Sequence, residues 1–176
     1  MADEYVKLFQ YGSNMNPGRL NDKTRLDNAA RPLGVARLDG HGIRFDLYSR
    51  GNGCGVSDIV KSPEEHVLGV LFDVPRHLVI APPGQLSKMD EIEGVRLDGT
   101  GNYRRVEVVV TFNGAPVPAY TYVGTDAGRA RFRSRTPDEQ KVSVAYFSHL
   151  EAGAARFNLD QSYRHYLKSM AGPLRP

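Results

Sequence analysis

Three carboxylates lie close together in the middle of the chain, in the segment Asp90-Glu91-Ile92-Glu93-Gly94. Apolar residues recur before Gly94 at three-residue spacing, which predicts a helix within His77–Gly94 that ends at this glycine. A carboxylate in the last turn of a helix lies at the negative end of the helix dipole, and this raises its pKa. Glu93, next to the apolar Ile92, is therefore a candidate general acid/base. A solvated acidic helix end fits the same residues, and a hard-cation site would need oxygen ligands from elsewhere.

A second candidate follows the first apolar run of the chain and has the sequence Tyr11-Gly12-Ser13-Asn14. Its glycine lets the chain turn and lets a ligand come close to the backbone. Asn16 and Pro17 then suit the N-cap and the first position of a helix. A strand, a turn and a helix N-terminus in succession can hold a carboxylate or a developing oxyanion. The same pattern also occurs as a purely structural turn.

Two other stretches carry reactive or charged side chains. Cys54 lies in a glycine-rich link with no helix N-terminus behind it and no histidine or arginine placed near it by spacing except Arg50, so a loop or barrel-lining thiol is favoured over a nucleophile. Arg129–Arg135 alternates arginine with small or aromatic residues, and as a strand it would place four guanidinium groups on one side. Such a stretch could dock nucleic acid, an acidic carrier protein or an anionic substrate tail, or it could be a solvated loop. The histidines show no metal-ligand spacing, so no metal site is predicted.

The composition is that of an ordinary globular protein, and we expect a single domain over residues 1–176. The net charge of +3 gives no general reason to expect nucleic acid as a partner. No apolar run reaches the roughly 20 residues that span a bilayer, and the acidic N-terminus does not resemble a signal peptide. The single cysteine excludes an intrachain disulfide and favours the cytoplasm. The sequence leaves the oligomeric state open.

Alternating and apolar runs predict a largely β core over about 5–124, with helices over about 137–171. After the first strand, the expected strands are Leu33–Leu38, Gly42–Tyr48, Val56–Val60, His66–Val74, Tyr103–Phe112 and Pro116–Val123. The expected turns are Asp39–Gly42, Lys61–Glu65 and Asn113-Gly114. The expected C-terminal helices are Asp138–Glu151 and Asp160–Ala171, with Gly153 between them. This pattern predicts an α+β domain built on a closed or nearly closed mixed sheet.

These motifs together resemble the γ-glutamyl cyclotransferase superfamily, which includes the AIG2-like proteins. Tyr11–Asn14 resembles the substrate-binding motif at the end of the family's first strand. Gly55–Phe72 resembles the central hairpin, although Asp58 takes a position where a small residue is more usual. Asp90-x-x-Glu93-Gly94, followed by Tyr103, resembles the acidic motif with the catalytic glutamate. The resemblance implies a small mixed β-barrel flanked by helices, with the site in the barrel mouth.

The resemblance also implies an activity and a set of site residues. Glu93 would be the catalytic acid/base, and the substrate-binding residues would be Tyr11, Gly12, Ser13, Asn14, Tyr103 and Tyr122. The α-amine of a small γ-glutamyl substrate would attack its own γ-carbonyl, so that 5-oxoproline and an amine are released. No metal or organic cofactor is expected. The alternative is a binding module of the same fold that uses Arg129–Arg135 to dock an anionic partner.

Overall fold

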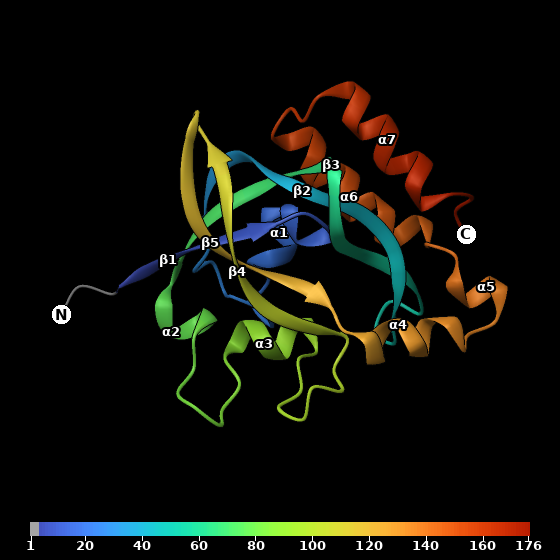
Figure 1. Ribbon diagram of the computed structural model, residues 1–176, viewed down its shortest axis with the longest axis horizontal. Helices are drawn as coiled ribbons and strands as arrows, with labels where there is room; N and C mark the ends of the chain where they lie inside the picture. The colour runs from blue at the N-terminus through green and yellow to red at the C-terminus, as the bar shows by residue number, and fades with distance from the viewer. Residues whose placement is uncertain (1–3) are drawn as a thin grey trace.

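The computed structural model describes residues 4–176, and its centre is a closed five-stranded barrel (Figure 1). The strand order around the barrel is β1-β3-β2-β4-β5. The barrel is mixed, because β1 pairs parallel with β5 whereas the other neighbours pair antiparallel. The strands are β1 (Tyr5–Gln10), β2 (Arg31–Ser49), β3 (Cys54–Pro75), β4 (Tyr103–Phe112) and β5 (Ala115–Gly124). The predicted fold class, an α+β protein with a small mixed barrel, is confirmed.

The helices are short and lie outside the barrel. They are η1 (Ser13–Met15), α1 (Pro17–Leu20), α2 (Arg76–Val79), α3 (Lys88–Glu93), α4 (Asp126–Arg133), α5 (Pro137–Gln140), α6 (Val144–Arg156) and α7 (Gln161–Ala171). In Figure 1, α6 and α7 cover one side of the barrel, and α3 and α4 lie at its opposite end. Among the described residues, no helix is long and apolar enough to cross a membrane.

The long hairpin β2–β3 replaces four strands that the sequence predicted as separate. The turn expected at Asp39–Gly42 is instead a shift of register within β2, with Gly40 at a φ of 69°. The prediction of a hairpin at Lys61–Glu65 is also wrong, because the strand β3 continues through these residues and pairs with β2 on both sides of them. A bulge and a tight turn both favour glycine and polar residues, so local sequence does not distinguish them.

The β4–β5 hairpin turns at Asn113-Gly114, as predicted. Both residues have positive φ, 50° for Asn113 and 78° for Gly114, which is the conformation of a type I′ turn. Asn16 and Pro17 also take their predicted places, since the Asn16 side chain accepts a hydrogen bond from the Gly18 N–H and Pro17 opens α1.

The predicted helix within His77–Gly94 is two short helices, α2 and α3, separated by a loop that contains Pro82 and Pro83. A proline inside a helix removes a hydrogen bond and clashes with the preceding turn, which explains the break. Gly94 does end α3, with a left-handed φ of 69°. At the other end Ser87 caps the helix and forms a capping box with Asp90.

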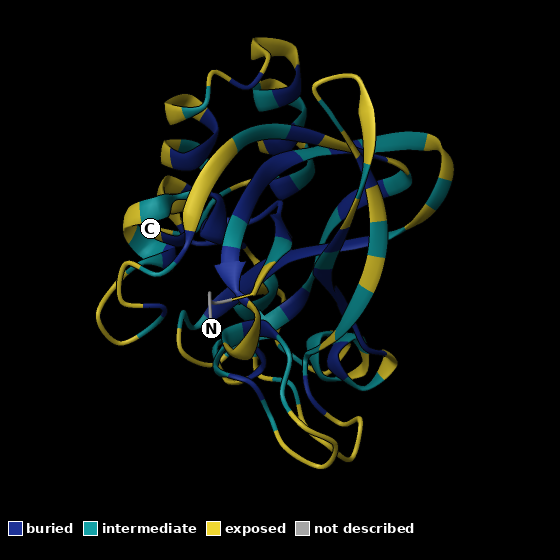
Figure 2. Ribbon diagram, turned by 90° about the vertical axis from the view of Figure 1, so that its left-hand side faces the viewer, coloured by how far each residue is buried: buried dark blue, intermediate teal, exposed yellow. Residues whose placement is uncertain are grey.

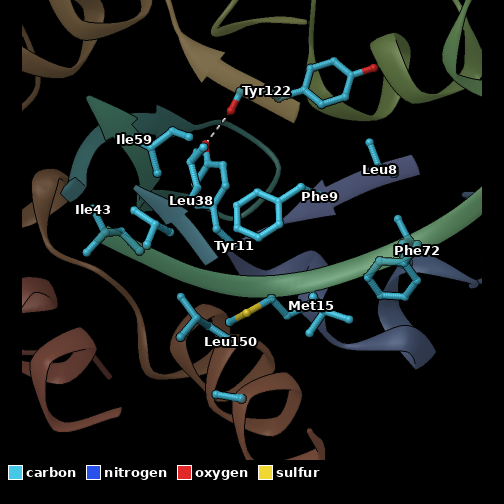
Figure 3. Close-up of a cluster of buried hydrophobic side chains, with 14 of the residues drawn as sticks. Leu8, Phe9, Tyr11, Met15, Leu38, Ile43, Ile59, Phe72, Tyr122 and Leu150 are labelled. Atoms are coloured by element: carbon cyan, nitrogen blue, oxygen red, sulfur yellow. Dashed lines mark hydrogen bonds between the residues drawn. The ribbon is translucent and has the colours of Figure 1, made fainter. Parts of the chain in front are cut away.

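The C-terminal helices differ from the prediction in their boundaries. The predicted helix over Asp138–Glu151 divides into α5 and α6, and Gly153 lies inside α6 rather than between helices. Gly153 is buried, and a Cβ atom there would lie 2.6 Å from the Asn16 backbone nitrogen. The glycine therefore lets α6 pack directly on the segment after β1, and in the core Met15 lies beside Leu150 of α6 (Figure 3).

The apolar core continues from the barrel interior to the inner faces of the C-terminal helices. Figure 2 shows buried residues concentrated on the barrel strands and on the sides of the helices that face them. The first strand contributes Leu8 and Phe9, both fully buried. Because β1 lies between β3 and β5 in this core, the polar residues that follow it are held at a fixed position at the end of the barrel.

Candidate active site

A pocket of about 460 Å³ opens at the end of the barrel where β1 finishes and β4 begins. Its lining includes every residue that the sequence assigned to the site, namely Tyr11, Gly12, Ser13, Asn14, Glu93, Tyr103 and Tyr122. These residues come from the η1 turn, the end of α3 and the β4–β5 hairpin. Segments that are far apart in the sequence thus meet in one cavity, whereas the roles of the individual side chains stay predictions.

Glu93 is the last residue of α3, and its side chain reaches the turn after β1. The Asn14 Nδ2 atom donates a hydrogen bond of 2.8 Å to the Glu93 Oε1 atom. Asn14 is in turn held by Arg25, whose Nη2 donates to the Asn14 Oδ1 atom at 2.8 Å. Among the described residues no group hydrogen-bonds to Oε2 of Glu93, so one carboxylate oxygen is fixed and the other is available to a ligand.

Burial raises the pKa of the Glu93 carboxyl group above its usual value. Arg25 and the hydrogen bond from Asn14 oppose this shift, because both favour the charged carboxylate. The direction of the pKa shift agrees with the sequence prediction, although burial is its main cause rather than the helix dipole. A carboxyl group with a raised pKa can take up and return a proton close to neutral pH.

Asp90 holds α3 in place against the barrel. Its carboxylate accepts hydrogen bonds from Arg105 of β4, at 2.8 and 2.7 Å, and from the Tyr122 hydroxyl at 2.9 Å. It is buried and also accepts from the Ser87 N–H at the start of α3. Asp90 and Glu93 are three residues apart, so they project from the same side of the helix. Asp90 thereby fixes the position of Glu93, a role that the sequence did not assign to it.

Gly12 is required by a close approach of Ser57, a residue of β3. A Cβ atom at position 12 would lie 2.2 Å from the Ser57 Oγ atom, which is far inside van der Waals contact. Ser57 is held by Tyr146 of α6, since the Tyr146 hydroxyl lies 2.9 Å from Ser57 Oγ and accepts from the Ser57 N–H at 3.1 Å. The sequence suggested that a ligand would use the space at Gly12, but a protein side chain occupies it.

The N–H groups of Ser13 and Asn14 open the η1 turn and find no acceptor among the described residues. This is expected for the first residues of a helix, whose N–H groups have no partner within it. Both residues are buried and line the pocket, so their N–H groups are potential donors to a ligand. The Gln10 side-chain amide nitrogen is also buried without a partner at the same end of the barrel.

Three tyrosines of the predicted site are held by hydrogen bonds to the protein. The Tyr11 hydroxyl donates to the Tyr122 backbone oxygen at 2.7 Å (Figure 3), and the Tyr103 hydroxyl donates to the Ser57 backbone oxygen. The pKa of each of these three phenols is raised, mainly by burial. All three therefore stay protonated at neutral pH, and they shape the pocket as neutral side chains.

The sequence matches the family model described as "Gamma-glutamyl cyclotransferase, AIG2-like" over residues 8–143. The chain belongs to this family. No curated protein matches the sequence. One solved structure, titled "Gamma-glutamyl cyclotransferase", is 22% identical with a TM-score of 0.71, and the match covers 98% of this chain and 94% of the other.

Two further solved structures share the fold. YkqA from Bacillus subtilis is 21% identical with a TM-score of 0.72, and the match covers 98% of this chain and 56% of YkqA. A yeast γ-glutamyl cyclotransferase described as specific to glutathione is 16% identical with a TM-score of 0.55, with 96% and 98% of the two chains covered. At these identities the likeness concerns the fold, which agrees with the family membership.

Within this γ-glutamyl cyclotransferase fold, Asp58 has a structural role. Its carboxylate is completely buried and accepts hydrogen bonds from Arg129 of α4, at 2.7 and 3.0 Å. It also accepts from the N–H groups of Gly124 and Ile59. Asp58 thus joins β3 to the end of β5 and to α4, and this explains a charged residue where the resemblance suggested a small one.

The arginine-rich segment is helical through Arg133, so it is not a strand that places four guanidinium groups on one side. Arg129 is bound to Asp58 in the interior, Arg133 is exposed, and only Arg131 and Arg135 line the pocket. Thr125 caps the helix and Arg131 and Arg133 lie in its last turn, so the segment has ordinary helix-end signals that outweigh its alternating pattern.

Cys54 is buried, and its sulfur accepts a hydrogen bond from the Ser143 hydroxyl at 3.3 Å. The thiol is outside the pocket lining, so the structure agrees with a packed rather than a nucleophilic cysteine. Within residues 4–176, no three His, Cys, Asp or Glu side chains are grouped in a way that could hold a metal ion.

Proposed function

We propose that the protein is a γ-glutamyl cyclotransferase with Glu93 as its general acid/base. The observation that carries the proposal is the Glu93 carboxyl group. It has a raised pKa, one oxygen is held by Asn14, the other has no hydrogen bond among the described residues, and the residue lines a cavity large enough for a small peptide. Family membership supports the same reaction class. The substrate class that we propose is a γ-glutamyl amide, whose leaving group is an amine, an amino acid or a peptide.

In the proposed reaction the substrate's α-amine attacks its own γ-carbonyl carbon. The new C–N bond closes a five-membered lactam, and the original amide C–N bond breaks. Glu93 takes a proton from the attacking amine and returns a proton to the leaving amine, so no proton is gained or lost overall. Since nucleophile and electrophile belong to one molecule, the protein has mainly to hold the substrate folded, and aligned intramolecular reactions reach effective molarities of about 10⁵ M or more.

The turn after β1 would stabilise the negative charge that develops on the γ-carbonyl oxygen. Its unpaired N–H groups, at Ser13 and Asn14, are suited to hold this oxygen or the substrate's own carboxylate. Tyr11, Tyr103 and Tyr122 would enclose the γ-glutamyl group as neutral walls of the pocket. Gly12 would keep the turn in place by admitting the Ser57 hydroxyl.

The test is the release of 5-oxoproline from a panel of γ-glutamyl amino acids, γ-glutamyl amines and glutathione. We expect turnover of at least one member by the wild type and a loss of about 10³-fold or more in Glu93→Gln, because a positioned acid/base contributes about 10²–10⁴-fold. Glu64→Gln is the matched control, since it makes the same chemical change at an exposed residue outside this pocket.

A folded Glu93→Gln variant with full activity would show that the proton is carried by another group. No turnover of any panel member by the folded wild type would contradict the proposed activity toward these substrates. That result would favour a binding module of the same fold.

A further inference from the structure

The charged side chains around the pocket are mostly cationic. Two carboxylates line it, those of Glu91 and Glu93. Arginines from several parts of the chain line it, namely Arg19, Arg25, Arg50, Arg96, Arg131 and Arg135. The helices α3 and α4, which flank this opening, lie at the same end of the barrel (Figure 1). This excess of positive charge is local, because the whole chain carries a net charge of only +3.

Two of the pocket arginines, Arg25 and Arg19, are hydrogen-bonded to neutral groups. Arg25 donates to the Asn14 side-chain oxygen, and Arg19 donates to the Asn52 side-chain oxygen at 3.2 Å. The Nε atom of each is buried and has no partner among the described residues. Neither arginine forms an ion pair within residues 4–176, and each has an unused donor beside the cavity.

The remaining pocket arginines have no carboxylate partner inside the pocket. Arg131 donates to the Thr100 backbone oxygen and the Asn102 side-chain oxygen, and the guanidinium of Arg135 lies 4.3 Å from the centre of the Tyr48 ring. Arg135 has an ion pair at 3.6 Å, with Glu139 on the side of α5. In residues 4–176, Arg50 and Arg96 form no ion pair and are exposed at the rim.

Guanidinium groups gathered around one cavity repel one another, and an anion in the cavity relieves this repulsion. Charges that line a concave site also focus the field and attract ligands of opposite charge. The γ-glutamyl group supplies a single carboxylate, which can engage one or two arginines in bidentate contacts. The other arginines then face the part of the substrate that leaves.

We propose that the leaving amine is itself acidic and carries a side-chain carboxylate or a phosphate group, which Arg50, Arg96, Arg131 and Arg135 bind. The inference rests on the reaction proposed above and names the class of amine that is released. It distinguishes an anionic amino acid, peptide or phosphorylated amine from a neutral or cationic amine.

The test compares two substrates of nearly equal shape, γ-glutamyl-glutamate and γ-glutamyl-glutamine, which differ by one negative charge. We expect the wild type to prefer the glutamate compound by about tenfold or more in kcat/KM at low salt, and we expect the preference to shrink as NaCl is raised. A second pair, γ-glutamyl-phosphoethanolamine and γ-glutamyl-ethanolamine, shows whether phosphate or carboxylate is the preferred anion. Equal kcat/KM values within both pairs would overturn the inference and leave the reaction intact.

The variant Arg50→Gln/Arg96→Gln removes two rim charges that make no ion pair in the protein. We expect it to reduce the preference for the more negative member of each pair by about fivefold to tenfold, mainly through KM. Arg133→Gln/Arg104→Gln is the matched control, because it removes two exposed arginines outside the pocket lining. If the control variant lost the preference to the same extent, the cause would be the net charge of the protein, and the assignment of anion binding to Arg50 and Arg96 would be overturned.

A binding experiment separates failure of this inference from failure of the proposed reaction. If no compound is turned over, calorimetric titration of γ-glutamyl-glutamate and γ-glutamyl-glutamine into Glu93→Gln measures recognition without chemistry. Tighter binding of the glutamate compound, lost in Arg50→Gln/Arg96→Gln, would keep the acidic ligand class although the reaction had failed. Equal or undetectable binding of both compounds would overturn the inference.

Discussion

At the scale of single residues, the pKa of Glu93 results from two opposing influences. Burial at the pocket wall disfavours the carboxylate, whereas Arg25 and Asn14 favour it. Burial prevails, so the group is protonated at a higher pH than an ordinary glutamate. The hydrogen bonds link Arg25 to Glu93 through Asn14, and nothing in the loop sequence around Arg25 marked it as part of the site.

This balance predicts the acid limb of the pH–rate profile. Because the attacking amine needs a deprotonated base, kcat/KM should rise with pH around a pKa above the ordinary glutamate value of about 4.3. Arg25→Gln should move this limb to still higher pH, since it removes the charge that lowers the pKa of Glu93. The measurement is kcat/KM for 5-oxoproline release between pH 4 and 9, with Arg133→Gln as the control. A limb at or below the ordinary value, or one unchanged by Arg25→Gln, would contradict this account.

At the scale of elements, the site depends on how closely two segments approach. The turn after β1 and the strand β3 meet where Gly12 faces the Ser57 hydroxyl, and Tyr146 of α6 fixes that hydroxyl from the other side. On the opposite wall, Asp90 ties α3 to β4 and β5. Asn14 and Glu93 meet because both segments are held in this way.

Gly12→Ala should therefore displace the turn and lower both stability and activity. A Cβ atom at 2.2 Å from Ser57 Oγ forces a shift, and overpacking of this kind costs about 1–3 kcal/mol. Activity should fall further than stability explains, because Asn14 moves with the turn. The measurements are urea denaturation and 5-oxoproline release.

The double variant Gly12→Ala/Ser57→Ala provides the control. It removes the offending oxygen and leaves the Ser57 Cβ atom 3.5 Å away, an ordinary contact, so part of the stability should return. If Gly12→Ala alone were as stable as the wild type, or the second change gave no recovery, the close approach would not be the reason for the glycine.

At the scale of the whole molecule, a buried ion pair joins the barrel to the segment that follows it. Arg129 of α4 forms ion pairs with Asp58 of β3 at 2.7 Å, with Asp126 at 3.4 Å and with Asp46 of β2 at 3.6 Å. The pKa of Asp46 is raised, first by burial and then by the charge of Asp58. Arg129 thus balances three acidic groups while it holds α4 against the barrel.

Arg129→Met should destabilise the protein by about 3–5 kcal/mol, because it leaves the Asp58 carboxylate buried without its cation. The double variant Arg129→Met/Asp58→Asn should lose less than the sum of the single variants, since no uncompensated charge remains. The measurement is urea unfolding of the four proteins of this cycle. Additive effects would mean that the two residues do not stabilise each other.

The sequence by itself determined the elements whose signals are local. The Asn113-Gly114 hairpin, the Gly94 helix end and the Asn16-Pro17 helix start all follow from backbone preferences of the residues concerned. The motifs at Tyr11–Asn14 and Glu93, together with the family resemblance, also led to the barrel and to the residues that line its pocket.

Only the tertiary structure decided how these elements continue and what surrounds them. The strands β2 and β3 stay paired on both sides of the turns that the sequence predicted within them. In Arg129–Arg135, helix-end signals outweighed the alternating pattern of arginines. The roles of Ser57 and Asp90 depend on hydrogen bonds to residues 15 or more positions away in the sequence. The role of Arg25 depends on its hydrogen bond to Asn14, which is 11 positions away. Such contacts depend on packing and burial, and no local pattern of residue types encodes them.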